Sequence, residues 1–146
     1  MAAHLSGWDG AMMGTTLIEG DYAEGAYGPT ILLVLSSADA TNWLRATFDH
    51  LAAAPEGTDI RFDAQPEVVL GAAVMQLTLR VVDQVPDRHL VRDGSGGFTW
   101  SCTRAEWHMA SLLIEPLATQ VGHQYLTSEI EDDALIEVSR GEHHRR

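Results

Sequence analysis

The sequence has a single cysteine, few basic residues and no long apolar run, and each shortage excludes a class of protein. Cys102 is alone, so no disulfide can form within the chain, which is typical of a protein from a reducing cytoplasm. The longest purely aliphatic run, residues 31–35, is far too short for a transmembrane helix. The first residues have neither the basic region nor the apolar stretch of a secretory signal. We therefore expect a cytoplasmic protein.

Basic residues are far outnumbered by acidic ones. Nine Lys and Arg residues stand against 21 Asp and Glu residues, which gives a formal net charge of -12. Such a surface repels phosphate backbones and anionic membranes. We therefore expect no nucleic-acid partner and no membrane partner, and the attractive partners are a basic protein surface, a metal ion or an amine. The alternative is that the charge only keeps the protein soluble.

The length and composition fit one folded unit. The chain has 146 residues, of which 45% are hydrophobic, so it can bury a substantial core. We expect a single α+β domain over residues 1–146, in which residues 1–14 are loosely ordered because they show no clear period. We identify no internal repeat and attribute the similar strand–helix–strand units of the two halves to the architecture.

The first segment with helical periodicity follows a pair of capping residues. Ser36 and Asp39 stand at the spacing of a capping box, although Asp is a weaker match than Glu at the second position. Apolar residues then recur at intervals of three and four until Pro55. This pattern predicts a helix over about 38–53.

The second helical segment has a complete capping box. Thr103 and Glu106 have the required spacing, and an apolar stripe follows them. Pro116 near its end limits or kinks the helix. We predict this helix over about 104–118.

The remaining patterns predict strands. The unbroken apolar run at 30–35 is typical of a central strand covered on both faces, and the alternation at 75–81 indicates a half-buried strand. The glycines of 93–97 suit a hairpin loop between strands at 89–92 and 98–102.

Shorter segments at 15–19, 59–63 and 134–138 complete the predicted sheet. Two helices on one sheet bury both helix stripes and the one-sided strands. The fold class we predict is α+β, with a mostly antiparallel sheet of about six or seven strands packed with the two main helices.

Motifs for catalysis or cofactor binding are absent from the sequence. The seven histidines lack the two-His helical spacing of a hydrolytic zinc site, and no serine has the Gly-x-Ser-x-Gly surroundings of a nucleophile. Cys102 shares a strand face with Phe98 and Trp100, which predicts a core residue; the alternative is a thiol activated by the helix start at Thr103. The loop 93–97 lacks the Lys-Ser/Thr ending of a phosphate-binding loop. We expect no catalytic residue, no metal and no cofactor.

Two acidic segments with neighbouring tyrosines are the candidate binding surface. Carboxylates next to an exposed aromatic ring suit the Lys or Arg side chains of a partner, and the alternative is that both segments are solvated loops. The candidate residues are Glu19, Asp21, Tyr22, Glu24, Tyr125, Glu129, Glu131, Asp132 and Asp133.

The C-terminal half resembles small bacterial proteins of uncharacterised function. The segments that carry this resemblance are Trp107 with LIEPL (113–117), GHQYL (122–126) and DALIEV (133–138). Size, acidity and α+β layout are also similar to the immunity proteins that neutralise bacterial toxins. That second similarity is one of type, and no catalytic residue is carried over from it.

Three hypotheses for function follow. The leading one is a non-enzymatic protein-binding domain, an immunity-type inhibitor of a basic partner protein. The second is a small-molecule-binding or hydrolytic domain with a pocket between sheet and helix, where His108, His123 and Cys102 supply the polar groups. The third is a self-assembling protein, such as a homodimer that pairs through an open sheet edge.

Overall fold

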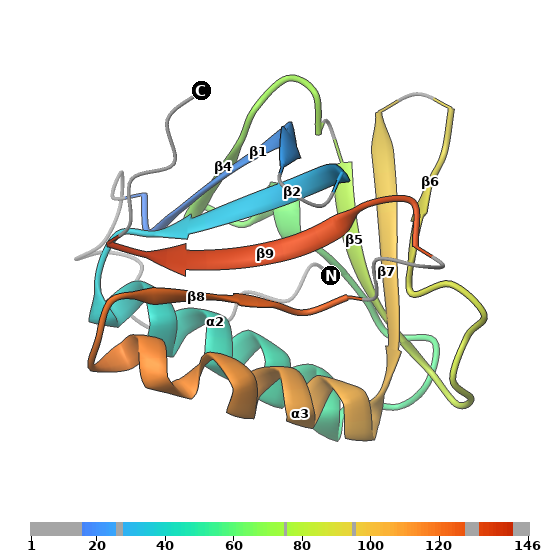
Figure 1. Cartoon of the computed structure of the whole chain (residues 1–146). Coiled ribbons are helices and arrows are strands. Elements are labelled where there is room, and N and C mark those ends of the chain that lie inside the picture. The colour runs from blue at the N-terminus through green and yellow to red at the C-terminus, as the bar shows by residue number, and fades with distance from the viewer. Residues whose placement is uncertain (1–15, 26–27, 75, 95, 128–131, 142–146) are drawn as a thin grey trace.

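The computed structural model describes five stretches of the chain, residues 16–25, 28–74, 76–94, 96–127 and 132–141 (Figure 1). Residues 1–14 and the candidate residues Glu129 and Glu131 lie outside these stretches, so what the sequence predicts for them stays a prediction. Among the described helices, none is both long and apolar enough to cross a membrane.

The first main helix, α2 (Ala38–Ala53), confirms the predicted range. It begins after Ser37, whose hydroxyl accepts a hydrogen bond from the backbone N–H of Ala40 at 3.2 Å. The prediction of Ser36 as the cap is therefore wrong by one residue. Asp39 lies in the first turn, where its negative charge interacts favourably with the helix dipole.

The second main helix, α3 (Arg104–Ile114), begins with the predicted capping box. The Thr103 hydroxyl accepts from the backbone N–H of Glu106 at 3.2 Å, and the Glu106 carboxylate accepts from the backbone N–H of Thr103 at 2.9 Å. The chain then tightens into a short 3-10 helix, η2 (Glu115–Ala118), because Pro116 has no N–H with which to continue an α-helix. Together α3 and η2 cover the predicted range.

The strands form two sheets whose strands run in crossed directions in Figure 1. The five-stranded sheet has the order β4 (Val68–Leu70), β1 (Ile18–Gly25), β2 (Gly28–Leu35), β9 (Leu135–Arg140) and β8 (Gly122–Tyr125). The four-stranded sheet has the order β3 (Asp59–Arg61), β5 (Gln76–Val82), β7 (Gly97–Thr103) and β6 (Leu90–Arg92). A short 3-10 helix, η1 (Phe62–Ala64), follows β3.

The α+β class and the two main helices are confirmed, but the predicted sheet is wrong in two respects. Both sheets are mixed rather than mostly antiparallel, since β1 pairs with β4, β2 with β9 and β5 with β7 in parallel. The described strands number nine rather than six or seven. The sequence pattern misses β4 and β8 because three or four residues are too few to establish an alternation. Parallel partners are also far apart in sequence, so no local pattern reveals them.

The two sheets repeat one topology. The order β1-β2-β9-β8 alternates antiparallel, parallel and antiparallel pairing, and so does the order β6-β7-β5-β3. In each case a hairpin leads into a helix, after which two strands join the other sheet: β3 and β5 after α2, and β8 and β9 after α3. The short strand β4 is the exception, because it returns to pair with β1. Each half of the chain thus contributes two strands to the sheet of the other half, in an equivalent order. The sequence analysis did not predict this exchange of strands.

One hydrophobic cluster joins both sheets to both helices. Its centre is aromatic: the ring centroids of Phe48 on α2 and Trp107 on α3 are 5.5 Å apart, and those of Trp107 and Trp100 on β7 are 4.8 Å apart. Phe98 and Cys102 of β7 are buried in the same cluster, as their shared strand face predicts.

The two helices lie antiparallel and are tied at both ends. The Thr41 hydroxyl near the start of α2 donates to the carbonyl of Leu117 at 3.1 Å. At the other end, the Arg104 guanidinium at the start of α3 donates to the carbonyl of Ala54 at 3.2 Å. The helix pair is therefore one layer of the fold, packed beside the sheets (Figure 1).

Candidate functional site

The acidic stretch on β1 is divided between the two faces of the sheet, because successive side chains of a strand alternate. Glu19 and Asp21 are exposed on the face that points away from the hydrophobic cluster. Tyr22 lies on the other face, partly buried, with its ring centroid 5.9 Å from that of Phe98. Glu24, two residues on, has the same orientation as Tyr22 and is exposed. The four candidate residues therefore divide into two pairs on opposite faces, and Glu19 and Asp21 are the pair on the outer face.

Glu19 and Asp21 border a hollow of about 410 Å³ on this outer face. This β1 hollow is lined by Glu19, Gly20, Asp21, Leu32, Val34, Val69 and Gly71. Val69 is 53% exposed beside the two carboxylates. A Cβ atom on Gly71 would lie 2.6 Å from the Asp21 carboxylate, so only glycine fits there without displacing that group. An apolar floor with carboxylates at its rim suits a Lys or Arg side chain, which has an apolar stem and a cationic end.

Tyr125 lies on the same outer face, at the far side of the five-stranded sheet. The strand register pairs Asp21 with Leu32, Leu32 with Glu137, and Glu137 with Tyr125, so these four residues form one row across the sheet. Three strand spacings separate Asp21 from Tyr125, which amounts to about 14 Å. The sequence-predicted residues Asp21 and Tyr125 therefore share a face, but they do not touch.

Asp132 and Asp133 are held within the fold. Asp132 accepts hydrogen bonds from the backbone N–H groups of His89 and Leu90, at 2.5 and 3.0 Å. Asp133 accepts from the Arg88 guanidinium and from the backbone N–H of Arg92, both at 2.8 Å. These two carboxylates fasten the chain before β9 to the strand β6, so they are not freely solvated.

The described arginines are all engaged with the chain itself. The contacts are Arg45 with Ser111 and Glu115, Arg61 with Asp63, Arg80 with Asp59, Arg88 with Asp133, Arg92 with Tyr22, Arg104 with Ala54, and Arg140 with Leu117. Exposed carboxylates such as Glu19, Asp49 and Asp83 have no arginine partner among the described residues. The excess negative charge is therefore presented to solvent.

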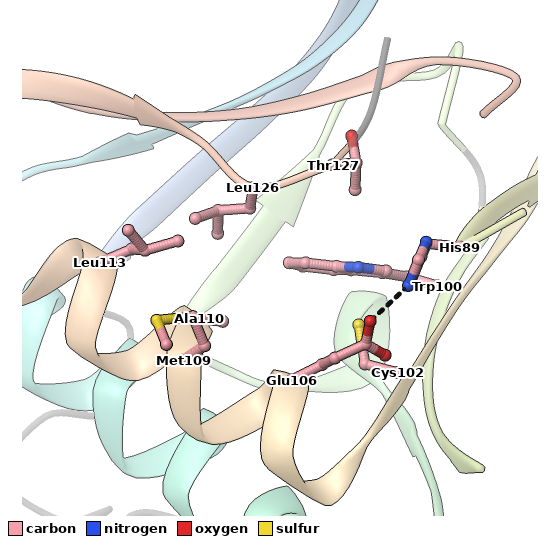
Figure 2. Close-up of a pocket in the computed structure, with 9 residues that line it drawn as sticks. All are labelled: His89, Trp100, Cys102, Glu106, Met109, Ala110, Leu113, Leu126 and Thr127. Atoms are coloured by element: carbon pink, nitrogen blue, oxygen red, sulfur yellow. Dashed lines mark hydrogen bonds and ion pairs between the residues drawn. The ribbon is translucent and has the colours of Figure 1, made fainter. Parts of the chain in front are cut away.

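A second concave site, of about 200 Å³, lies between α3, β7 and the chain that follows β8. This α3 cleft is lined by His89, Trp100, Cys102, Glu106, Met109, Ala110, Leu113, Leu126 and Thr127. In Figure 2 the α3 side chains Met109 and Leu113 form one wall, Leu126 and Thr127 lie opposite, and His89 and Cys102 close one end. The cleft has an apolar end and a polar end.

The polar end is an imidazole and a carboxylate in fixed positions. His89 Nε2 lies 2.8 Å from Glu106 Oε2, and the other oxygen of Glu106 is held by the backbone N–H of Thr103. The backbone of His89 is fixed on both sides, since its N–H donates to Asp132 and its carbonyl accepts from the N–H of Ser101 at 2.7 Å. The helix cap and the β6–β7 hairpin thus set the geometry of this pair.

Trp100 and Cys102 lie side by side at the base of the cleft. Burial raises the pKa of the Cys102 thiol far above its ordinary value, the Glu106 carboxylate raises it further, and the indole N–H of Trp100 opposes these effects in part. The thiol is therefore protonated at neutral pH, unlike the activated thiol that the helix start at Thr103 suggests. Trp100 is 1% exposed, and apart from the Cys102 sulfur no described residue is a hydrogen-bond partner of its buried indole nitrogen.

The residues that the sequence assigns to a pocket between sheet and helix are brought together only in part. Cys102 lines the α3 cleft, whereas His108 is exposed on α3 and His123 on β8, and neither lines the cleft or the β1 hollow. The histidine in the cleft is His89 instead. Within the described stretches no group of three His, Cys, Asp or Glu side chains could hold a metal ion.

The pairing of His89 with Glu106 had a partial signal in the sequence. The capping box places Glu106 in the first turn of α3, and the hairpin places His89 just before β6. What brings them together is the register of β6 on β7, in which Leu90 faces Trp100. No sequence pattern gives that register, because a glycine-rich loop is compatible with more than one turn conformation and the turn sets the register.

Compared with known proteins, the chain matches no protein-family model, no curated protein and no solved structure.

Proposed function

We propose that this chain is a non-enzymatic, cytoplasmic binding protein for a basic protein, and that its contact surface is the outer face of the five-stranded sheet around the β1 hollow. The observation that carries this proposal is the position of Glu19 and Asp21 at the rim of that hollow, next to the exposed Val69. A Lys or Arg side chain of the partner would place its stem on Val34 and Val69 and its cationic end at the two carboxylates.

The charge distribution also supports the binding of a basic protein. Every described arginine contacts the chain itself, so an approaching partner meets a surface of uncompensated carboxylates. Such a field accelerates the association of a cationic protein and orients it before contact. The catalytic domain of a toxin, inhibited in the manner of an immunity protein, is a partner of this class.

The proposed surface is limited to the rim of the β1 hollow, because Leu32 and Glu137, in the middle of the row from Asp21 to Tyr125, are only 4% and 7% exposed. Tyr125 is a separate, partly buried candidate about 14 Å away. We leave Asp132 and Asp133 out of the proposed surface, because their carboxylates already accept hydrogen bonds from the chain at β6 and from Arg88.

Self-assembly through sheet edges is less favoured by the geometry. The strands at the four sheet edges, β4, β8, β3 and β6, have only three or four residues each. Short edge strands are a common way in which natural sheets avoid pairing with another chain. We therefore expect that two copies do not pair through these edges.

The test is affinity capture of partners from the protein's own cells with three forms of the protein. The wild type is compared with the double variant Glu19→Gln/Asp21→Asn and with the control Asp49→Asn/Asp83→Asn. Both variants lose the same amount of charge, but the control residues are exposed and lie outside the β1 hollow.

The wild type and the control should retain the same basic protein, and the Glu19→Gln/Asp21→Asn variant should retain about tenfold less of it. Raising the salt from about 50 to 300 mM should release the partner, because ionic screening weakens charge-dependent contacts. Equal retention by both variants would show that the β1 hollow is not the contact surface.

A further inference from the structure

We propose that two copies of this chain pair through the outer face of α3, as a weak dimer in which the two α3 helices lie antiparallel. This inference goes beyond the proposed binding of a basic protein, and it uses none of the residues of the β1 hollow. Its support comes from an exposed apolar stripe on α3, from the charge of the chain and from the two charged residues at the ends of that stripe.

The outer face of α3 is apolar. Met109, Leu112 and Leu113 are 52%, 42% and 36% exposed, although large apolar side chains are usually buried. Their spacings of three and four residues place them on one side of the helix. With the exposed neighbours on that side they form the α3 stripe, which consists of Ala105, His108, Met109, Leu112, Leu113 and Pro116.

The fold itself does not require an apolar stripe at this position. The helix α2 lies beside α3 in the same layer, and the inner faces of both helices are buried in the same hydrophobic cluster. An exposed apolar patch on only one of two such helices is typical of an interaction site. The exposed side chains of α2 are polar or small: Asp39, Asn42, Ala46, Asp49, His50 and Ala53.

The charge of the chain points to a second copy as the molecule that covers the stripe. The formal net charge of -12 makes two copies repel each other where carboxylates face carboxylates. Every residue of the α3 stripe is described, and none of them is Asp, Glu, Lys or Arg. Two copies can therefore touch at this stripe without that repulsion, whereas a basic partner finds no carboxylate within it.

The two ends of the stripe carry charges of opposite sign. Arg104 and Glu115 are both exposed, and they lie eleven residues or about three helical turns apart, so they project from the same edge of α3. In an antiparallel pair, Arg104 of one copy lies beside Glu115 of the second copy, and the two-fold symmetry repeats this contact. The helix dipoles are also antiparallel in this arrangement, which is favourable.

The contacts that these two side chains make within the chain leave room for the contact between copies. Arg104 donates to the Ala54 carbonyl through one guanidinium nitrogen, and its other N–H groups remain as donors. Glu115 lies 3.9 Å from Arg45, and its side chain is 59% exposed. Both groups can therefore form an additional ion pair.

The size of the stripe predicts a weak dimer. Six side chains from each copy bury well below the roughly 1,200 Å² of total surface that a stable interface needs. We therefore expect a dissociation constant on the order of 100 µM.

The test is sedimentation equilibrium of the full chain from about 10 to 500 µM, in about 50 and 500 mM salt. The wild type should change from monomer to dimer with concentration, and high salt should strengthen the dimer because screening reduces the repulsion between two anionic copies. Salt weakens the binding of a basic protein instead, so the two proposals can fail separately. A wild type that stays monomeric in both salts, or a dimer that salt weakens, overturns the proposal.

Matched variants locate the interface. Met109→Gln/Leu112→Gln keeps the charge and should raise the dissociation constant about tenfold. The control Val85→Gln/Val91→Gln changes two apolar side chains outside α3, which are 65% and 37% exposed, and should leave it unchanged. A dimer of wild-type strength in the Met109→Gln/Leu112→Gln variant, with the circular dichroism of the folded protein, overturns the proposal.

Charge reversal tests the antiparallel arrangement. Glu115→Arg lowers the net negative charge, so a general repulsion between copies would become weaker; in the proposed pair it places two guanidinium groups side by side and should weaken the dimer about fivefold or more. Arg104→Glu/Glu115→Arg has the wild-type net charge and should restore the dimer, because each ion pair forms again with its signs exchanged. A folded double variant that dimerises no better than Glu115→Arg contradicts the antiparallel pair.

Discussion

Asp132 Oδ1 lies 2.5 Å from the backbone nitrogen of His89 and also accepts the N–H of Leu90. A carboxylate that binds two successive N–H groups acts as a clamp on the strand that begins there. Asp133 continues the contact, since its backbone N–H donates to the carbonyl of Leu90 at 3.0 Å. This part of the acidic segment therefore satisfies the outer edge of β6, and the same clamp holds His89 in the wall of the α3 cleft.

The variant Asp132→Ala should destabilise the fold by about 1–3 kcal/mol, because it leaves two backbone N–H groups without their acceptor. The measurement is the free energy of unfolding in urea. Asp83→Ala, at an exposed aspartate, is the control and should stay within about 0.5 kcal/mol of the wild type. Equal effects of the two substitutions would mean that Asp132 is only a solvated charge.

The variant Ser37→Ala should lower the free energy of unfolding by about 1 kcal/mol, because it removes the hydroxyl that caps α2. Ser36→Ala is the matched control at the neighbouring, exposed residue, where we expect a change within about 0.5 kcal/mol. Urea denaturation of both variants decides between the observed cap and the one that the sequence spacing indicates. A larger loss for Ser36→Ala would restore Ser36 as the cap.

The parts of the fold that the sequence predicts well are those fixed by neighbours along the chain. Both helix ranges follow from caps and from three- and four-residue periods, and these depend on contacts within a turn or two. The β6–β7 hairpin follows from its glycine-rich loop. The mixed pairing does not, because β2 meets β9 only after the chain has crossed both helices.

The candidate sites show the same division. The acidic character of β1 is visible in the sequence, but strand alternation separates Glu19 and Asp21 from Tyr22 and Glu24. The strand predicted from the sequence ends near residue 19, whereas β1 continues to Gly25. The alternation that separates these side chains could therefore not be predicted. The α3 cleft needs the exchange of strands between the halves, because Leu126 follows β8 of the five-stranded sheet while Trp100 belongs to the four-stranded one. No single-segment pattern contains both.

In the variant Asp63→Asn, the free energy of unfolding should fall less at acidic pH than it does in the wild type. Burial raises the pKa of Asp63, but hydrogen bonds from the Arg61 guanidinium and from the backbone N–H of Leu77, with the charge of Arg61, leave it below its ordinary value of 3.8. A lowered pKa in the folded state stabilises the fold above the unfolded pKa, and this stabilisation is lost as pH falls through the folded value. At pH 7 the variant should be less stable than the wild type by about 1 kcal/mol.

The difference in the free energy of unfolding between Asp63→Asn and the wild type should shrink as pH falls below 3.8, because the carboxyl of the unfolded wild type takes up a proton before that of the folded protein. Asp59→Asn serves as the comparison, because Asp59 also binds an arginine, Arg80, but both side chains are more than 40% exposed. Its effect on the free energy of unfolding should be at most about 0.5 kcal/mol at pH 7. If the free energies of unfolding of Asp63→Asn and the wild type differ by the same amount from pH 7 to pH 3, the Asp63 charge does not stabilise the fold.

The Cys102 thiol should react slowly with a disulfide reagent in the folded protein. It is 5% exposed, and burial together with the Glu106 carboxylate raises its pKa, so both access and thiolate content are low. Because the chain has one cysteine, the absorbance of the released thiolate reports Cys102 alone. We expect labelling at pH 7 to be at least about 100-fold slower in the native state than in urea.

The labelling rate of the native protein should still rise at about pH 9, where the rate for an ordinary thiol begins to level off. Rapid labelling of the folded protein, or a rate that levels off below pH 8, would instead indicate an activated thiol and favour the hydrolytic alternative for the α3 cleft.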